Sequence, residues 1–539
     1  MADTTTSATH GSRYWPAVLA ACIGVIVVAY NTTAVMTALP AIKFSFDMDK
    51  QTLQWVVNIY MLAAAVAIAT MGRFADIFGA MRIFGVGLGA FAVGSLAIIL
   101  AGDAAMILIG RAFQGLGAAG VISTSVALVT LATPEDRRAQ ALGLWSAAVA
   151  FGFAIGPLIG GLMTDAISWR GIFVLDIPLL AVAVLLCVWV TRLGLAPRAI
   201  ETKTRIDYLG IALLAVALGT LVYGLSSGDA AGWTSAQTLS LFVIAALAGI
   251  AFVFRESRAP DPLVYFSLFR HRSYAAGTFG MFLTGAMLMG VLYFFNLFIQ
   301  APGTLDFTVF QAGLALLPFT LAMFAVSMTV PRLLAQGGFR WAVTIGMLVL
   351  AAGFWLLHDT GNQTPYGDLW WKLLIAGIGM GLVFSLLPRV GLLELSDESA
   401  GQGSGIINTF LFVGLSMGIA AGSIVAVQIR HAYIGPIIEK LMPGTSDLRA
   451  TEITLLHGSK GEVDQILAQF SPEKAEEIRV AIVQVLDDAF AGVTELMTVL
   501  GLVGSILCFF LLRTLGESAA PEASRAGGAA RGDGSRDNT

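Results

Sequence analysis

The chain of 539 residues is strongly apolar: 57% of its residues are hydrophobic, 12% are charged, and the formal net charge is only −4. A soluble globular domain carries about 25% charged residues, so this composition argues against a water-soluble fold. The sequence also lacks the basic blocks that are typical of nucleic-acid-binding proteins, so no nucleic-acid partner is expected.

Long apolar runs follow one another along nearly the whole chain. A membrane-spanning helix needs about 20 mostly apolar residues, and none of the runs alternates with the period of two that a β-barrel strand requires. The sequence therefore predicts an all-α polytopic membrane protein. Its fourteen predicted spans are 14–38, 53–71, 80–101, 104–131, 140–164, 171–192, 208–226, 235–255, 273–299, 309–330, 341–357, 368–388, 403–427 and 488–513.

The distribution of basic residues predicts the orientation of these spans. The short connections on one side hold only Lys43, Lys50, Arg170 and Lys372. An excess of Lys and Arg marks the cytoplasmic side, so we expect a protein of the bacterial inner membrane with both termini in the cytoplasm. The basic residues of the predicted inside segments are Arg73, Arg82, Arg137, Arg138, Arg192, Arg198, Lys203, Arg205, Arg255, Arg258, Arg270, Arg272, Arg332, Arg340, Arg389 and Arg513.

The polar segments divide the chain into two halves with an insertion between them. A weak internal repeat supports the halves: "GRFADIFGAMR" (72–82) and "PRLLAQGGFR" (331–340) align Gly79 with Gly338, and parallel repeats are a transporter architecture. The predicted parts are a cytoplasmic N-terminus over 1–13, a six-helix bundle over 14–192, cytoplasmic linkers with two inserted helices over 193–272, a second six-helix bundle over 273–513 with an external loop over 428–487, and a disordered cytoplasmic tail over 514–539.

The connection after the second predicted span carries an acid between two glycines. Gly72 and Gly79 permit a tight turn around Asp76. A carboxylate there can accept hydrogen bonds from backbone amides or pair with an arginine. We therefore predict a conformational latch formed by Gly72, Asp76, Gly79 and Arg82; an ordinary acidic loop residue is the alternative.

The fourth predicted span contains an arginine well inside its apolar run. A central arginine costs about 2.5–3.5 kcal/mol, so Arg111 is expected to face a cavity or a polar partner, with Gln114 on the same helix face. The alternative is a side chain that extends to the interface. No span carries an obvious carboxylate at mid-depth, since Asp176 and Asp207 lie near helix ends. Arg111, Gln114 and Asn31 are the predicted proton and substrate pathway, in which Arg111 gates a nearby acid or a water chain.

The fifth predicted span reads "GFAIGPLIGG", with glycines at every fourth position. Such a stripe of small residues lets helix backbones touch, and Pro157 favours a kink because it lacks an N–H group. We expect a bent helix in close contact with a partner helix, able to pivot and to exclude water. A static packing seam is the alternative. The residues of this motif are Gly152, Gly156, Pro157, Gly160 and Gly161.

Several amide and aromatic residues in the spans are candidate substrate contacts. For each polar one the alternative is an interhelical hydrogen bond, worth about 0.6–2 kcal/mol. A pocket of amides and aromatic rings without a fixed negative charge suits a neutral or weakly anionic aromatic solute, because a buried cation needs a counter-charge. These candidates are Asn58, Tyr60, Tyr293, Phe294, Asn296, Gln300 and Asn408.

The three segments around Asp76, Arg111 and Gly156 resemble the signature motifs of the major facilitator superfamily, the third of which is associated with its antiporters. The fourteen predicted spans, "TALP" at the end of the first span and "WRGIFVLDIP" (169–178) resemble the fourteen-span drug:proton antiporter branch. The resemblance implies two six-helix bundles that exchange drugs or amphiphilic aromatic compounds for protons by alternating access. Asn31 departs from the branch, which often has an aspartate there, and an asparagine cannot carry a proton.

The expected partners are a small-molecule substrate, protons and the lipid bilayer, with a periplasmic adaptor protein as a further candidate. One alternative function is the uptake or exchange of a specific neutral metabolite such as a vitamin. A more remote one is a membrane receptor that does not transport. No enzyme, cofactor or metal site is expected, because the sequence has no phosphate-binding GxxxxGK[ST] loop and no metal-ligand spacing around its three cysteines.

Overall fold

The computed structural model describes residues 14–193, 206–301, 303–334, 338–361, 364–395, 397–441 and 460–513. These residues are almost entirely helical, and they contain no strand. The expected N-terminal segment 1–13 and tail 514–539 lie outside the described residues, as do 194–205 of the linker and 442–459 of the expected external loop.

Six long helices form the first half of the chain. Acidic side chains cap two of them: Asp49 accepts a hydrogen bond from the backbone N–H of Thr52 at 2.6 Å, and Asp103 accepts one from that of Met106 at 2.8 Å. The helices are α2 (Trp15–Phe46), α3 (Lys50–Phe78), α4 (Ala80–Ile99), α5 (Ala104–Ala132), α6 (Arg138–Ala166) and α7 (Gly171–Arg192).

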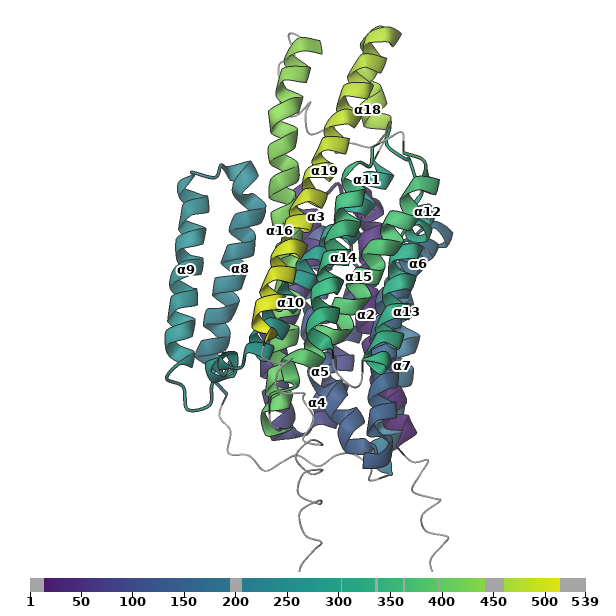
Figure 1. Cartoon of the computed structure of the whole chain (residues 1–539). Helices are drawn as coiled ribbons and strands as arrows, with labels where there is room; N and C mark the ends of the chain where they lie inside the picture. The colour runs from purple at the N-terminus through teal and green to yellow at the C-terminus, as the bar shows by residue number, and fades with distance from the viewer. Residues whose placement is uncertain are drawn as a thin grey trace, which may run out of the picture.

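A helical hairpin, α8 (Tyr208–Ala231) and α9 (Ala236–Glu256), is inserted between the halves. Asp207 caps α8 by accepting from the N–H of Gly210 and also binds Arg255 Nε at 2.9 Å, which joins the two helices of the hairpin at one end. In Figure 1 the hairpin stands beside the main bundle, where α8 contacts α3 of the first half and α16 (Asp397–Leu441) of the second.

The second half repeats the six-span plan with two irregular spans. One irregular span, Arg272–Gln300, contains a π-helical stretch. The other is a bent pair of helices, α12 and α13, whose axes differ by 40°. The helices of the second half are α10 (Arg272–Met289), η3 (Gly290–Phe295), α11 (Asn296–Gln300), α12 (Val309–Ala315), α13 (Leu317–Leu333), α14 (Phe339–His358), α15 (Tyr366–Leu392), α16, α18 (Lys460–Leu467) and α19 (Pro472–Leu511). Two short 3₁₀ turns complete the described elements: η1 (Glu135–Arg137) precedes α6, and η2 (Phe266–Arg270) precedes α10.

The predicted all-α membrane fold is confirmed. Among the described residues, thirteen helices are long and apolar enough to cross a membrane, and the bent pair makes fourteen if it counts as one span. α16 and α19 are longer than their predicted spans 403–427 and 488–513, so the expected external segment 428–487 begins and ends as helix. Both helices project beyond the rest of the bundle (Figure 1).

The two halves pack their helices in the same pattern. In the first half, α2 contacts α5, α6 and α7, while α4 contacts α5 and α7. In the second half, α10 contacts α15, α16 and α19 in the same way, while α14 contacts α15 and α19. The repeat is also local, because Gly79 and Gly338 precede α4 and α14 with φ of 94° and 83°, a backbone conformation that favours glycine.

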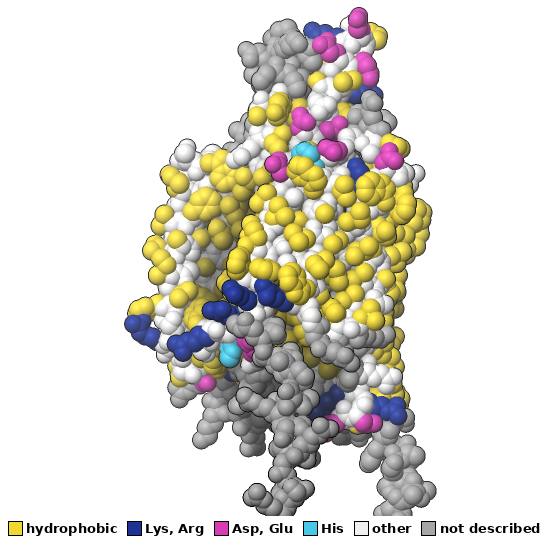
Figure 2. Space-filling model, viewed as in Figure 1, with side chains coloured by type: hydrophobic (Ala, Val, Ile, Leu, Met, Phe, Trp, Pro, Cys, Tyr) yellow, Lys and Arg dark blue, Asp and Glu magenta, His cyan; other side chains and the backbone are white. Residues whose placement is uncertain are grey.

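The bundle has two ends, which we name by their residues. The base is the end where α2 begins at Trp15 and α19 ends at Leu511, and the top is the end from which α16 and α19 project. Hydrophobic side chains cover the middle of the face in Figure 2, dark-blue Lys and Arg gather along its lower border, and most of the acidic side chains lie above it. An apolar belt between charged ends is the surface that a lipid bilayer requires.

Candidate functional site

Arg111 on α5 points into the first half rather than to the membrane interface. Its side chain is fully buried. Nε donates to the backbone oxygen of Val56 at 2.9 Å, while Nη1 donates to Asn31 Oδ1 at 2.6 Å and to Gln114 Oε1 at 2.8 Å. The guanidinium also lies 4.2 Å from the centre of the Tyr60 ring, a cation–π contact. The predicted trio of Arg111, Gln114 and Asn31 is thus in direct contact.

Asp176 on α7 completes this cluster. The side chain is fully buried, and its Oδ2 accepts from Asn31 Nδ2 at 3.0 Å, Ser95 Oγ at 2.7 Å and Gln114 Nε2 at 3.3 Å. Its Oδ1 accepts from the hydroxyl of Tyr30. Asp176 lies near the start of α7, as its place in the sequence indicates, but the packing of α7 against α2 and α4 puts its side chain inside the bundle, next to Asn31 and Gln114.

Two amides join the cation to the anion. Asn31 and Gln114 each accept a hydrogen bond from Arg111 with the amide oxygen and donate one to Asp176 with the amide nitrogen. An unpaired buried charge is strongly destabilising, whereas an ion pair with satisfied hydrogen bonds is tolerated. We define the Arg111–Asp176 network as Tyr30, Asn31, Ser95, Arg111, Gln114 and Asp176. With Asp176 ionised it pairs one cation with one anion and is neutral overall.

Among the predicted pathway and substrate residues, three buried donors have no hydrogen-bond acceptor in the described part of the chain. They are Nη2 of Arg111, Nδ2 of Asn58 and Nδ2 of Asn296. Leaving such a group unsatisfied costs about 1–3 kcal/mol. Each is a donor that an oxygen atom of a bound ligand or a water molecule can satisfy.

The two halves meet through polar and aromatic contacts in the upper part of the bundle. Asn58 Oδ1 accepts from Ser416 Oγ at 3.1 Å, and Gln54 Nε2 donates to Ser423 Oγ at 2.6 Å. The ring of Tyr60 lies 6.4 Å from that of Phe412. Two of the predicted substrate residues, Asn58 and Tyr60, are thus at the interface between α3 and α16.

Four more of the predicted substrate residues share one irregular segment. Tyr293 and Phe294 lie in the π-helix η3, and Asn296 and Gln300 follow it in α11. Gln300 hydrogen-bonds Asn296 and donates to the backbone oxygen of Thr37 in the other half at 3.4 Å. π-helical stretches occur frequently at functional sites. Asn408 lies on another helix, α16, where its amide donates to the backbone oxygen of Ser404 at 3.0 Å.

The glycine face of α6 packs directly on α2. A Cβ at Gly156 would lie 1.8 Å from Thr33 Oγ1, and one at Gly160 would lie 2.2 Å from the backbone oxygen of Ala34. A Cβ at Gly152 would meet Ala29, while one at Gly161 would meet α12 of the other half, 2.6 Å from the oxygen of Val309. The stripe therefore gives the close helix contact that its spacing predicts; whether it pivots stays a prediction.

The predicted latch at the base is only partly assembled. Asp76 is half-buried and makes no hydrogen bond or ion pair with another described residue, and Arg82 is exposed. Arg73 instead reaches the segment after α9, where it donates to the hydroxyl of Tyr265 at 3.2 Å and lies 4.0 Å from Asp261. Gly79 supplies the turn, but a Cβ at Gly72 would meet open space.

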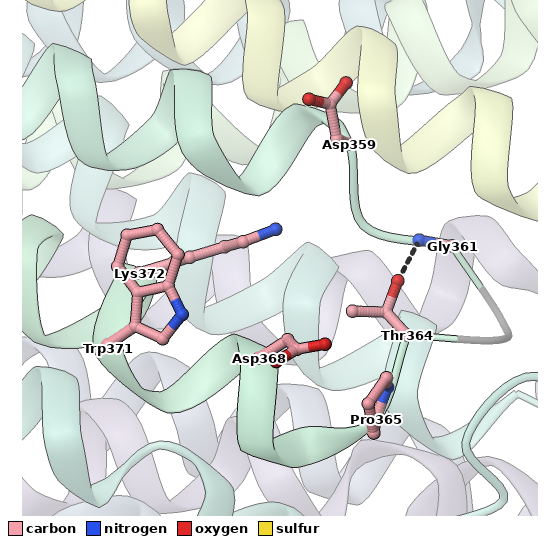
Figure 3. Close-up of a pocket in the computed structure, with 7 residues that line it drawn as sticks. All are labelled: Asp359, Gly361, Thr364, Pro365, Asp368, Trp371 and Lys372. Atoms are coloured by element: carbon pink, nitrogen blue, oxygen red, sulfur yellow. Dashed lines mark hydrogen bonds between the residues drawn. The ribbon is translucent and has the colours of Figure 1, made fainter.

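A surface hollow of about 610 Å³ opens at the top between α14 and α15. Figure 3 shows Lys372 extending into it between Asp359 and Asp368, with a hydrogen bond from the N–H of Gly361 to Thr364 Oγ1 at 3.0 Å. None of the Arg111–Asp176 network lines it. In the part of the chain that the structure describes, no cluster of three His, Cys, Asp or Glu could hold a metal ion.

Comparison with known proteins agrees with this architecture. The family model of the Major Facilitator Superfamily matches residues 21–419. The multidrug resistance protein Stp of Mycobacterium tuberculosis (strain CDC 1551 / Oshkosh) is 33% identical over 432 residues, 79% of this chain and 78% of that protein. The tetracenomycin C resistance and export protein of Streptomyces glaucescens is 32% identical over 456 residues, 84% of this chain and 83% of that protein.

A solved structure shares the fold. The bacterial homolog to the human lysosomal transporter Spinster, in an inward-facing and unoccupied conformation, superposes with a TM-score of 0.58 at 14% sequence identity, covering 95% of this chain and 99% of that one. Because the family model matches most of the chain and the two halves repeat one six-helix packing, this chain belongs to the Major Facilitator Superfamily. It is a multi-pass membrane transporter, not an enzyme.

Proposed function

We propose that this protein exports amphiphilic aromatic compounds, drugs among them, in exchange for protons by alternating access. The names of its relatives, a multidrug resistance protein and a tetracenomycin C resistance and export protein, support export. The observation that carries the proton coupling is the buried Arg111–Asp176 network, since an intramembrane ionisable pair marks an ion or proton pathway and this one is fully buried between four helices.

Alternating access is a rocking of the two halves about the site between them. The contacts Asn58–Ser416, Gln54–Ser423 and Gln300–Thr37 join the halves toward the top. In the transport cycle these contacts break when the top opens. The latch residues Gly72, Asp76, Gly79 and Arg82 would engage at the base in that state, and the α2–α6 glycine seam would act as the pivot.

The base is assigned to the cytoplasm, which places both termini there, in a bacterial inner membrane. The lower border of the apolar belt, rich in Lys and Arg in Figure 2, supports this orientation, because basic residues are enriched on the cytoplasmic side. The projecting ends of α16 and α19, with α18 packed on α19 through Val463 and Ile482, would then face the periplasm. They are the surface that a periplasmic adaptor protein would meet.

The substrate class follows from the charges of the site. The network is neutral, so a cationic drug finds no free counter-charge there. The unsatisfied donors of Arg111, Asn58 and Asn296 suit carbonyl or hydroxyl oxygens. The rings of Tyr60, Tyr293 and Phe294 are buried in this conformation and would offer aromatic contacts to a substrate when the halves separate. A neutral or weakly anionic aromatic compound fits this chemistry best.

Flux in everted membrane vesicles tests the proposal. The panel contains neutral, anionic and cationic aromatic compounds, each with and without an imposed pH gradient, and vesicles without the protein are the control. We expect accumulation of the neutral or weakly anionic compounds to depend on the gradient. Movement of a neutral metabolite in the opposite direction would indicate an uptake carrier, and no flux of any kind would indicate a receptor; either result contradicts the proposal.

A further inference from the structure

We infer that the carboxylate of Asp176 on α7 is the proton-binding group of the exchange, and that Asn31 and Gln114 transmit its charge state to Arg111. This inference rests on the proposed function and adds the residue that carries the proton. The branch that this chain resembles often has an aspartate on α2 at the position of Asn31, and an asparagine cannot titrate. The inference gives the proton-binding role to Asp176 instead, whose Oδ2 lies 3.0 Å from the Asn31 amide nitrogen.

Asp176 is the only acid placed inside the first six spans. Over residues 14–193, all of which the structure describes, the other acids of the helices are Asp76 and Asp165, each at a helix end. The ionisable side chains that face Asp176 are Tyr30 from α2 and Arg111 from α5, with Tyr60 from α3 behind Arg111. α4 contributes the hydroxyl of Ser95, and the charged residues of α4 and α6, Arg82, Arg138 and Asp165, lie at their helix ends.

The hydrogen bonds around Asp176 depend on its charge. As a carboxylate it accepts from four donors, namely the side chains of Tyr30, Asn31, Ser95 and Gln114. When a hydronium ion transfers its proton to one carboxylate oxygen, one O–H bond of the hydronium breaks, a carboxyl O–H bond forms and a water molecule is left, so that the group becomes a neutral acid with a donor of its own. At least one of the four donors must then turn away.

Protonation also removes the counter-charge of Arg111. Its guanidinium reaches Asp176 only through the two amides, and its Nη2 has no acceptor among the described residues. A buried cation without a partner is strongly unfavourable, so the protonated network favours a state in which Arg111 gains water or substrate oxygen. Two conformations with different affinities for a proton are what coupled transport requires. Release of the proton restores the neutral network.

The test compares Asp176→Asn with the swap Asn31→Asp/Asp176→Asn in proteoliposomes. Two readouts are needed: substrate accumulation driven by a pH gradient, and substrate exchange at equal pH, which needs no net proton turnover. We expect Asp176→Asn to lose gradient-driven accumulation at least tenfold while its exchange stays within about threefold of wild type. The swap, which keeps one carboxylate in the network, is expected to restore accumulation in part. Asp368→Asn, in the surface hollow at the top, is the matched control.

Proton release from purified protein on addition of a transported compound is the direct readout. The wild type and Asp368→Asn are expected to release protons, and Asp176→Asn to release none. Asp176→Glu keeps the carboxyl group but moves it by one methylene, so the pH dependence of transport is expected to shift. If Asp176→Asn does not assemble, the pH profile of Asp176→Glu tests the inference in its place. The inference is overturned if Asp176→Asn shows gradient-driven transport or proton release. It is also overturned if Asp176→Glu has an unshifted pH profile, or if the swap folds but stays uncoupled. A wild type indifferent to the gradient refutes the proposed function instead.

Discussion

At Arg111, geometry matters as much as charge. Its planar guanidinium donates in three directions, to the oxygens of Val56, Asn31 and Gln114, while its face covers the Tyr60 ring. A lysine has a compact ammonium group that cannot match this fork. The position therefore specifies arginine rather than a cation in general.

Substituting Arg111 tests this view. Arg111→Ala leaves Asp176 as a buried anion without its cation, a loss of about 3–5 kcal/mol, and we expect substrate export to fall to background. Arg111→Lys is expected to retain less than a tenth of wild-type export, because the charge remains but the donors are displaced. Export and membrane abundance are measured together, with Arg258→Ala, in the exposed turn that follows α9, as control. Wild-type export by Arg111→Lys would show that charge alone suffices.

The sequence predicts part of this cluster and misses the rest. Gln114 follows Arg111 by one helical turn, so their contact is local and readable from spacing. Asp176 and Tyr30 are predicted poorly, since their contact joins helices α2 and α7, which are far apart in the chain. The available signal was the lone acid within "IFVLDIPLL", because an acid in a span is a functional-site candidate wherever it lies along the helix.

At the scale of single helices, the seam between α2 and α6 is the most tightly specified contact. The backbone of α6 reaches α2 at Gly156, where any side chain would collide with Thr33 and with the oxygen of Tyr30. Tyr30 itself donates to Asp176. Tyr30 thus connects the seam directly to the Arg111–Asp176 network.

A matched pair of glycine substitutions on α6 tests the seam. Gly156→Ala would place a Cβ 1.8 Å from Thr33 Oγ1, whereas a Cβ at Gly143 meets nothing within 4 Å. Overpacking costs about 1–3 kcal/mol, so we expect Gly156→Ala to lower both the thermal midpoint of the purified protein and its export. Gly143→Ala is expected to leave both unchanged. Equal midpoints for the two variants would mean that the seam is loose.

The helices themselves were largely predictable, while their irregularities were not. The predicted span 80–101 matches α4, which covers Ala80–Ile99, because the length of an apolar run sets the length of a span. The predicted span 309–330 is a bent pair, α12 and α13, that hydropathy cannot distinguish from a straight helix. The π-helix η3 likewise depends on packing, and it changes which side chains of α10 and α11 face the other half.

At the scale of the whole molecule, the two halves repeat one packing pattern and meet near the top through α3 and α16. The side chains of Gln54 and Ser423 touch across this junction at 2.6 Å. If the halves rock, this contact must open once in every transport cycle. If the bundle is static, the contact can stay closed without consequence.

Cross-linking of this junction distinguishes the two cases. The variant Gln54→Cys/Ser423→Cys is joined by a short cross-linker that attaches to both thiols through disulfide bonds. We expect export to stop when the cross-link forms and to return when a reductant cleaves the disulfides. Ser423→Cys alone, treated identically, serves as the control and is expected to keep its activity. Undiminished export by fully cross-linked protein would exclude rocking of the halves about this site.

The topology makes a separate prediction at this scale. Fourteen spans return the chain to its starting side, so reporter fusions at both ends are expected to give the same cytoplasmic signal. The described part of the chain gives fourteen only when α12 and α13 form one span. Reporters on opposite sides of the membrane would contradict that count and the two matched halves with it.

Simultaneous measurement of proton and substrate movement is the decisive test of proton exchange by this protein. Proteoliposomes are loaded with a transported aromatic compound and a pH-sensitive dye, at equal pH inside and outside, and the compound is allowed to flow out. If protons enter in exchange for the compound, the lumen acidifies as the compound leaves, and Arg111→Ala abolishes both signals. Outflow of the compound through the wild-type protein at constant lumenal pH would contradict proton exchange.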